Sequence, residues 1–136
     1  MKKLFFLLTL VLLGILVSSC GRTNDQIVGK WDDNIKLSQK SATINSNSNS
    51  VIITTESTYW WLNGISLNGI NADLSNIDRM SKNFTFSTSE YTVERKEDGK
   101  KILITMNVNA SNSDRILLVS LQNGDYFDGI KITQSK

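Results

Sequence analysis

Short runs of β-branched and aromatic residues alternate with turn residues along most of the chain, and this spacing is the strongest constraint on its fold. The main runs lie at residues 51–55, 59–62, 84–86, 91–95, 102–108, 116–121 and 126–133, with shorter pieces at 35–37 and 43–44. Within them apolar and polar side chains alternate, which is typical of strands that bury one face. No amphipathic run could form a helix of 11 or more residues. The sequence therefore predicts an all-β chain of seven or eight strands, arranged as a sandwich or a barrel.

Glycine-containing dipeptides mark the expected turns. Asp98-Gly99 and Asn123-Gly124 each lie between two β-runs, and such dipeptides suit the positive φ angles of a type I′ turn. Each is therefore expected to join two antiparallel neighbours. The pentapeptide LNGIS at residues 62–66 recurs as LNGIN at 67–71, which predicts two successive Asn-Gly turns, and a polar insertion follows at 71–83.

Two adjacent tryptophans, Trp60 and Trp61, precede the first Asn-Gly pair. Neighbouring side chains of a strand point to opposite faces, so only one tryptophan can face a single core. Trp60 shares a face with Leu62, which predicts that these two lie in the core. Tyr59 and Trp61 then form an aromatic patch on the other face, and a bulge at Gly64 would turn the following apolar residues inward again. Because an exposed aromatic patch can stack against a sugar ring, Tyr59 and Trp61 are the predicted ligand-stacking residues.

The N-terminus has the features of a secretory signal. Two lysines precede an apolar run of 14 residues, which is shorter than the roughly 20 residues of a membrane span. Small residues at 18 and 19 come directly before Cys20. This arrangement resembles the lipobox of bacterial lipoproteins, in which the cysteine is lipidated and signal peptidase II cleaves just before it. The resemblance implies a signal peptide at 1–19, lipidation at Cys20, a tether at 20–26 and a lipid-anchored place in the bacterial cell envelope, expected at the outer membrane on either face.

Composition excludes several kinds of chemistry. The chain of 136 residues has 15 basic and 13 acidic side chains, but two lysines belong to the signal, so the mature chain is formally neutral. It offers no basic face for nucleic acid. Histidine is absent, and the single cysteine is assigned to lipid, which leaves neither the usual general base nor a thiol nucleophile. The pairs Asp32-Asp33 and Asp125/Asp128 lack the spacing of a calcium loop. We therefore expect no catalytic residues, no metal site and no cofactor.

Two stretches, VIITTESTYWW at residues 51–61 and NVNASNSDRILLVSLQNGDYFDGIKITQ at 107–134, resemble the BACON domain (Bacteroidetes-associated carbohydrate-binding often N-terminal). The matching positions are a tryptophan-bearing strand followed by Asn109, Ser113, Arg115, Gly124, Ile130, Ile132 and Gln134. The resemblance implies an immunoglobulin-like β-sandwich over residues 27–136. It also implies binding of carbohydrate or of mucin-type glycoprotein.

A second resemblance competes with the first. IVGKW at residues 27–31 is similar to the start of lipocalin-like lipoproteins, in which the tryptophan plugs the base of a barrel that holds an apolar small molecule. Three functions remain open: a non-catalytic glycan-binding lipoprotein, an accessory lipoprotein that binds a protein partner in the envelope, and a small-molecule carrier. All three contact the lipid bilayer through acylated Cys20, and none involves nucleic acid.

Overall fold

The computed structural model describes residues 31–136, which form nine strands and no helix. The predicted signal peptide, the predicted tether with Cys20, and residues 27–30 lie outside the described residues. The all-β prediction is confirmed, but the count of seven or eight strands is wrong. The strands are β1 (Ser41–Ile44), β2 (Asn49–Thr54), β3 (Trp61–Leu67), β4 (Ile70–Asn71), β5 (Phe84–Ser87), β6 (Tyr91–Lys96), β7 (Lys101–Met106), β8 (Arg115–Asn123) and β9 (Tyr126–Gln134). Strand β4 has two residues, which are too few to show an alternation in the sequence.

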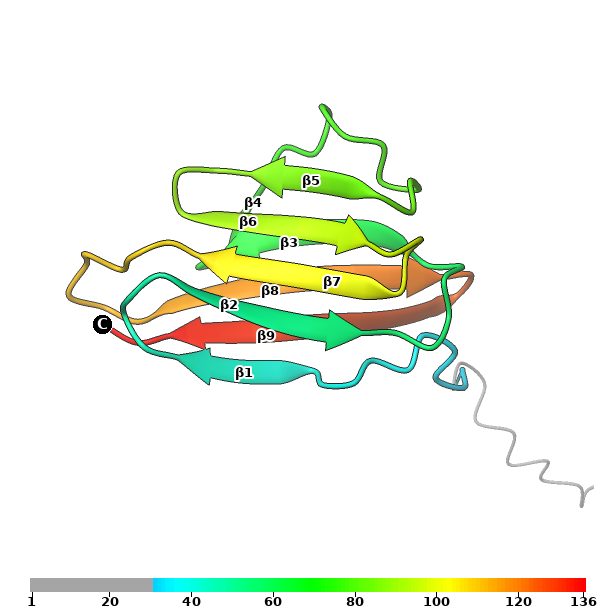
Figure 1. The fold of residues 1–136 in the computed structure, drawn as a ribbon, viewed down its shortest axis with the longest axis horizontal. Helices are drawn as coiled ribbons and strands as arrows, with labels where there is room; N and C mark the ends of the chain where they lie inside the picture. Colours follow the sequence, from blue (N-terminus) through cyan, green and yellow to red (C-terminus); the bar gives the residue numbers. More distant parts are fainter. Residues whose placement is uncertain (1–30) are drawn as a thin grey trace, which may run out of the picture. The chain divides into compact units, whose positions relative to one another are not determined.

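The strands build two sheets that pack face to face (Figure 1). One sheet has five strands in the order β1-β9-β8-β3-β4, and the other has four in the order β2-β7-β6-β5. All paired neighbours are antiparallel except β1 and β9, which are parallel. The runs β9-β8-β3 and β2-β7-β6 follow the GFC and BED orders of an immunoglobulin sandwich. The sandwich prediction is confirmed.

The barrel alternative is wrong, because the two sheets do not close on each other. Trp31, the residue that would plug the base of such a barrel, is 57% exposed. A period-two pattern cannot separate the two architectures, since strands of a barrel and of a sandwich both bury alternate side chains.

Two hairpins join antiparallel neighbours, as their glycine dipeptides predict. Gly99 lies between β6 and β7, and Gly124 lies between β8 and β9. The loop after β6 has four residues, three of which have positive φ: Glu97, Asp98 and Gly99. The loop after β8 has two residues and begins at Gly124, whose φ is +61°. Both antiparallel connections are therefore confirmed, although neither dipeptide occupies both central positions of a two-residue turn.

The repeated pentapeptide makes one turn and one bulge, so the prediction of two turns is wrong. Asn68 and Gly69, with φ of +50° and +81°, form the two-residue turn between β3 and β4. Asn63 and Gly64 instead remain inside β3, where the register shifts against β8. The extra residue lets Leu62 and the later apolar residues of β3 all face the core, as a bulge at Gly64 would require.

The core fills the space between the sheets and is built from alternate side chains of both. Along β7, Ile102, Ile104 and Met106 are at most 1% exposed, whereas their neighbours are partly exposed. The facing side chains from β3, β8 and β9 include Leu62, Ile65, Leu117, Val119, Leu121, Ile130 and Ile132. This core fixes which side of the five-stranded sheet is left open to solvent.

Candidate functional site

A row of three side chains crosses the open face of the five-stranded sheet. The register pairs Trp61 of β3 with Gln122 of β8, and Gln122 with Phe127 of β9. Directly paired residues share a face, and this is the outer face because Leu62 and Leu121, the next residues along, are fully buried. Phe127 is 59% exposed, and Trp61 is half-buried. The two rings therefore flank Gln122, two strand spacings or about 10 Å apart.

The adjacent tryptophan and tyrosine lie in different surroundings. Trp60 is 2% exposed, and Leu62 is fully buried beside it in the core. Tyr59 is 78% exposed but precedes β3, and its ring lies 5.6 Å from the Lys82 ammonium. The residue that shares a row with Trp61 is thus Phe127. Sequence reasoning missed Phe127, although its alternation with Ile130 places it on the outer face once the hairpin register is known.

Beside the aromatic row the sheet surface carries almost no side chains. The next outward-facing row pairs Gly64 of β3 with Ser120 of β8, and Ser120 with Gly129 of β9. A Cβ atom added at Gly64 would meet no atom within 4 Å. Space therefore opens directly above this row, about 7 Å along the strands from the rings.

That space continues into a cleft of about 700 Å³ between the outer face of β3 and the segment that follows β4. This volume lies within the range of about 300–1,000 Å³ found for small-molecule sites. The polar side chains that line it include Asn63, Ser66, Asn71, Asp73, Arg79 and Ser120. The five-stranded sheet lies behind the other in Figure 1, so the cleft and the aromatic row are on the side turned away from the viewer.

Residues 72–79, which follow β4, form one wall of the cleft. Backbone hydrogen bonds hold this wall against β3. The amide of Leu62 donates to the carbonyl of Arg79 at 3.0 Å, and the amide of Ala72 donates to the carbonyl of Ile65 at 2.9 Å. The Arg79 guanidinium donates to the carbonyl of Asn63 at 3.5 Å. The wall is therefore attached at both ends of the strand it covers.

Asp73 supplies a carboxylate to this wall. Its Oδ1 accepts the amide of Ser75 at 3.0 Å, and this bond lowers the pKa of Asp73 below its ordinary value. The carboxylate is therefore ionised at neutral pH and accepts hydrogen bonds. Among the residues that line the cleft it is the one acidic group.

A buried arginine fixes the chain on either side of this region. Arg95 is 1% exposed, and its guanidinium carbon lies 3.6 Å from the Trp60 ring centroid. It donates to the carbonyls of Thr58 and Ser81, each at 2.9 Å. Burial lowers its pKa to about 10. Because Thr58 leads into β3 and Ser81 follows the cleft wall, Arg95 positions both segments.

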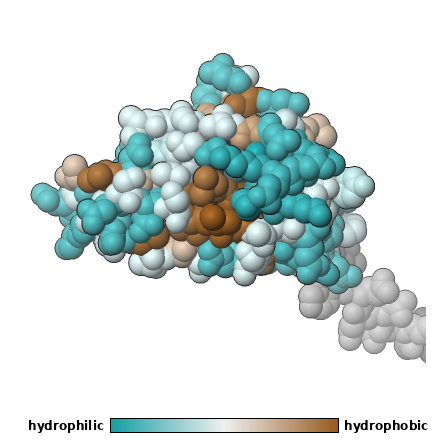
Figure 2. Space-filling view, in the orientation of Figure 1, coloured by the Kyte–Doolittle hydropathy of each residue, from teal (hydrophilic) through white to brown (hydrophobic). Residues whose placement is uncertain are grey.

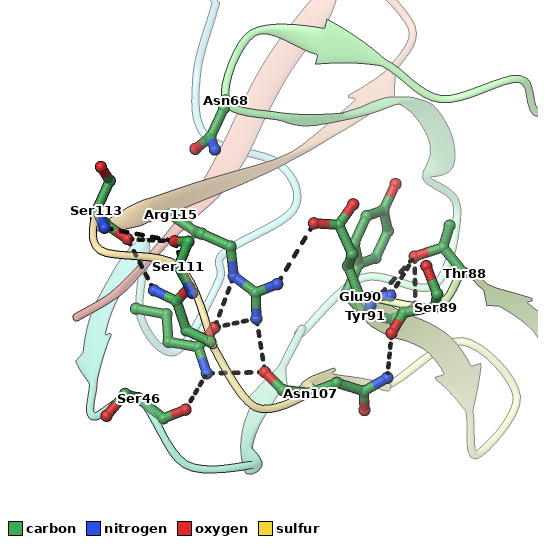
Figure 3. A network of polar contacts seen from close by, with 12 residues as sticks. Ser46, Asn68, Thr88, Ser89, Glu90, Tyr91, Asn107, Ser111, Ser113 and Arg115 are labelled. Atoms are coloured by element: carbon green, nitrogen blue, oxygen red, sulfur yellow. Dashed lines mark hydrogen bonds and ion pairs between the residues drawn. The ribbon is translucent and has the colours of Figure 1, made fainter. Parts of the chain in front are cut away.

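A second arginine organises a polar network at the junction of three loops (Figure 3). Arg115 donates through Nη2 to the carbonyl of Asn107 at 2.6 Å and through Nε to Oε1 of Gln134 at 3.1 Å. Asn109 donates to the carbonyls of Ser113 and Ser135. Several positions that carry the BACON resemblance therefore bind one another and the backbone. Arg115, Asn109 and Gln134 are buried, so in this protein they brace loops.

One aspartate from each of the two pairs, Asp33 and Asp128, binds the same lysine. The Lys40 ammonium lies 2.9 Å from Asp128 and 3.3 Å from Asp33. Hydrogen bonding to Asp128 is the main cause that raises the pKa of Lys40. Burial raises the pKa of Asp33, but bonds from the Lys36 amide, Lys40 and the Ile35 amide outweigh it and lower the pKa overall. Over residues 31–136, no three potential metal ligands come together.

No protein-family model matches this sequence, and no curated protein does either. The fold is similar to that of a protein from Bacteroides thetaiotaomicron solved by NMR. The TM-score is 0.62 at 16% sequence identity, over 85% of this chain and 96% of the other. At this identity the likeness extends to the fold alone. The described part of the chain has no helix capable of spanning a bilayer.

Proposed function

We propose that this protein is a non-catalytic, lipid-anchored glycan-binding protein of the bacterial cell envelope, and that it binds through the open face of β3, β8 and β9. The observation that carries the proposal is the row of Trp61, Gln122 and Phe127. Aromatic rings present a flat apolar surface with little conformational freedom. The apolar face of a sugar ring stacks on such a surface, and an amide between the rings can exchange hydrogen bonds with hydroxyl groups.

The proposal describes a non-catalytic protein because of the acidic residues that line the cleft. A glycoside hydrolase needs two carboxyl groups that face each other across the scissile bond. Asp73 is the one acidic residue among those that line the cleft, so the pair is not available there. The protein would therefore hold a glycan at the membrane and leave it intact.

The binding test uses the full chain, purified in a zwitterionic detergent because sugar-headed detergents would compete. Wild type is expected to bind members of an immobilised panel of plant, microbial and mucin glycans. Trp61→Ala and Phe127→Ala are each expected to lose most of that binding, while Tyr59→Ala serves as the matched aromatic control and keeps it. Equal binding by all four proteins, or no binding by wild type, would contradict the proposal.

Membrane attachment is proposed to depend on Cys20, the residue of the lipobox resemblance. Stable anchoring needs more than one acyl chain, which a lipoprotein cysteine supplies. Cys20→Ser is expected to move the protein from the detergent-rich phase to the aqueous phase in phase partitioning. A variant that is cleaved at the signal yet still partitions with detergent would show that another part of the chain anchors it.

The accessory role remains a second candidate because of a surface on the opposite sheet. Ile52 of β2 is 58% exposed and pairs with Leu103 of β7 on the outer face. Figure 2 shows an apolar patch in the middle of this sheet, surrounded by polar residues. Ile52→Lys is expected to abolish capture of an envelope protein if this face binds one, and to leave glycan binding unchanged.

A further inference from the structure

We propose that the aromatic row and the cleft form one extended site for an uncharged oligosaccharide, with the chain of sugars running along β3 from Trp61 to Asn71. This inference rests on the proposed function and adds to it the class of glycan and the direction of the chain. The inference depends on the aromatic row and the cleft forming one continuous surface. The row of Trp61 is followed by the Gly64–Ser120 row, and both Gly64 and Ser120 line the cleft.

The distances favour several sugar units. Successive outward-facing rows are about 7 Å apart along a strand, so the aromatic row, the Gly64–Ser120 row and the position of Ser66 form three successive steps. Asn71, which pairs with Ser66, lies at the far end. A single sugar stacked on Trp61 does not reach the amide of Asn71, whereas an extended chain does. Affinity should therefore increase with chain length until the cleft is occupied.

The lining of the cleft favours a neutral ligand. Its amides at Asn63 and Asn71 and its hydroxyls at Ser66 and Ser120 can each donate or accept hydrogen bonds, as vicinal sugar hydroxyls require. The charged groups are one carboxylate, Asp73, and one guanidinium, Arg79, which is already bonded to the carbonyl of Asn63. These charges cancel. An acidic sugar would meet Asp73, and a cationic ligand would meet Arg79, so neither gains a net attraction.

Gly64 provides a way to fill the cleft without disturbing the fold. Its φ is outside the left-handed region, and a Cβ there meets nothing within 4 Å. Valine at this position therefore fits the strand and projects its methyl groups into the open space. Thr85→Val on the outer face of β5 serves as a control, because it places a valine on the outer face of the other sheet.

The experiment measures affinity by titration calorimetry, again with the full chain in zwitterionic detergent. The probes are a disaccharide and a hexaose of each of the cello, malto, xylo and manno series, with a galacturonate hexamer as the acidic probe. Wild type is expected to bind one neutral hexaose at least about tenfold more tightly than its disaccharide. Gly64→Val should abolish that difference, and Asn71→Ala should reduce it, while Thr85→Val keeps it. Melting temperatures verify that each variant is folded.

The outcomes separate the inference from the proposed function. If Trp61→Ala abolishes binding but Gly64→Val binds the hexaose as wild type does, the aromatic row acts alone and the extended site is refuted. Stronger binding of the galacturonate hexamer than of any neutral hexaose would refute the uncharged class. If no probe binds, and the glycan panel shows no binding either, the proposed function and the inference both fail.

Discussion

Truncating the two adjacent tryptophans should have unequal effects on stability. Trp60 is 2% exposed, stacks 3.6 Å beneath the Arg95 guanidinium carbon and donates from Nε1 to Thr55 Oγ1 at 3.2 Å. Trp60→Ala leaves a cavity and removes these contacts, which should lower the free energy of unfolding by about 3–5 kcal/mol. Trp61 is half-buried on the open face, and its loss should cost about 1 kcal/mol, roughly half of the transfer free energy of a fully buried side chain.

Urea denaturation measures the difference. With a slope of about 2 kcal/mol per molar urea, Trp60→Ala should move the midpoint by about 2 M or prevent folding, and Trp61→Ala by about 0.5 M. Trp60→Phe is an informative intermediate, because it keeps a ring beneath Arg95 and loses only the bond to Thr55 and part of the contact area. If Trp61→Ala is as destabilising as Trp60→Ala, the second tryptophan is structural and the stacking surface loses its principal residue.

Two further predictions concern a turn and an ion pair. Gly99→Ala should destabilise the protein more than Gly69→Ala, since both have positive φ but only the Cβ at Gly99 would meet Arg95, at 2.7 Å. The Gly69 variant should lose about 1 kcal/mol in thermal or urea melts, and equal losses would show that Arg95 simply moves aside. Asp33 has a pKa below its unfolded value of 3.8, so its stabilisation is present above that value and is lost as pH falls through the folded pKa. Lys40→Met, which removes the ion pairs with both Asp128 and Asp33, should therefore cost about 0.5–1 kcal/mol at neutral pH and nothing in strong acid, and a pH-independent cost would refute a contribution from these pairs.

Local patterns predicted much of the architecture. The alternation along residues 102–106 identifies β7 because each second side chain must enter the core. The Asp98-Gly99 and Asn123-Gly124 dipeptides identify antiparallel hairpins, because glycine accepts positive φ. The alternation through Trp60 and Leu62 places those two side chains toward the core. Each of these inferences depends only on residues close together in the sequence.

The remaining features depend on contacts between distant segments. The parallel pairing of β1 with β9 joins Ser41 to Lys131, and no local pattern specifies such a partner. The position of Phe127 in the same row as Trp61 requires the register of three strands, and a one-residue shift would move its side chain to the other face. The cleft forms only because the segment after β4 is tied back to β3 at Leu62 and Ile65. If the segment after β4 followed another path, a chain of the same composition would leave the outer face of β3 without a cleft.

The most direct test of the glycan-binding surface is chemical-shift mapping by NMR of the isotope-labelled mature chain, titrated with the neutral hexaose that binds most tightly. The perturbed signals are expected to cluster at Trp61, Gly64, Ser120, Gln122 and Phe127, with Tyr59 unchanged. Perturbations confined to the outer face of the four-stranded sheet, around Ile52 and Leu103, or no saturable perturbation at all, would contradict it.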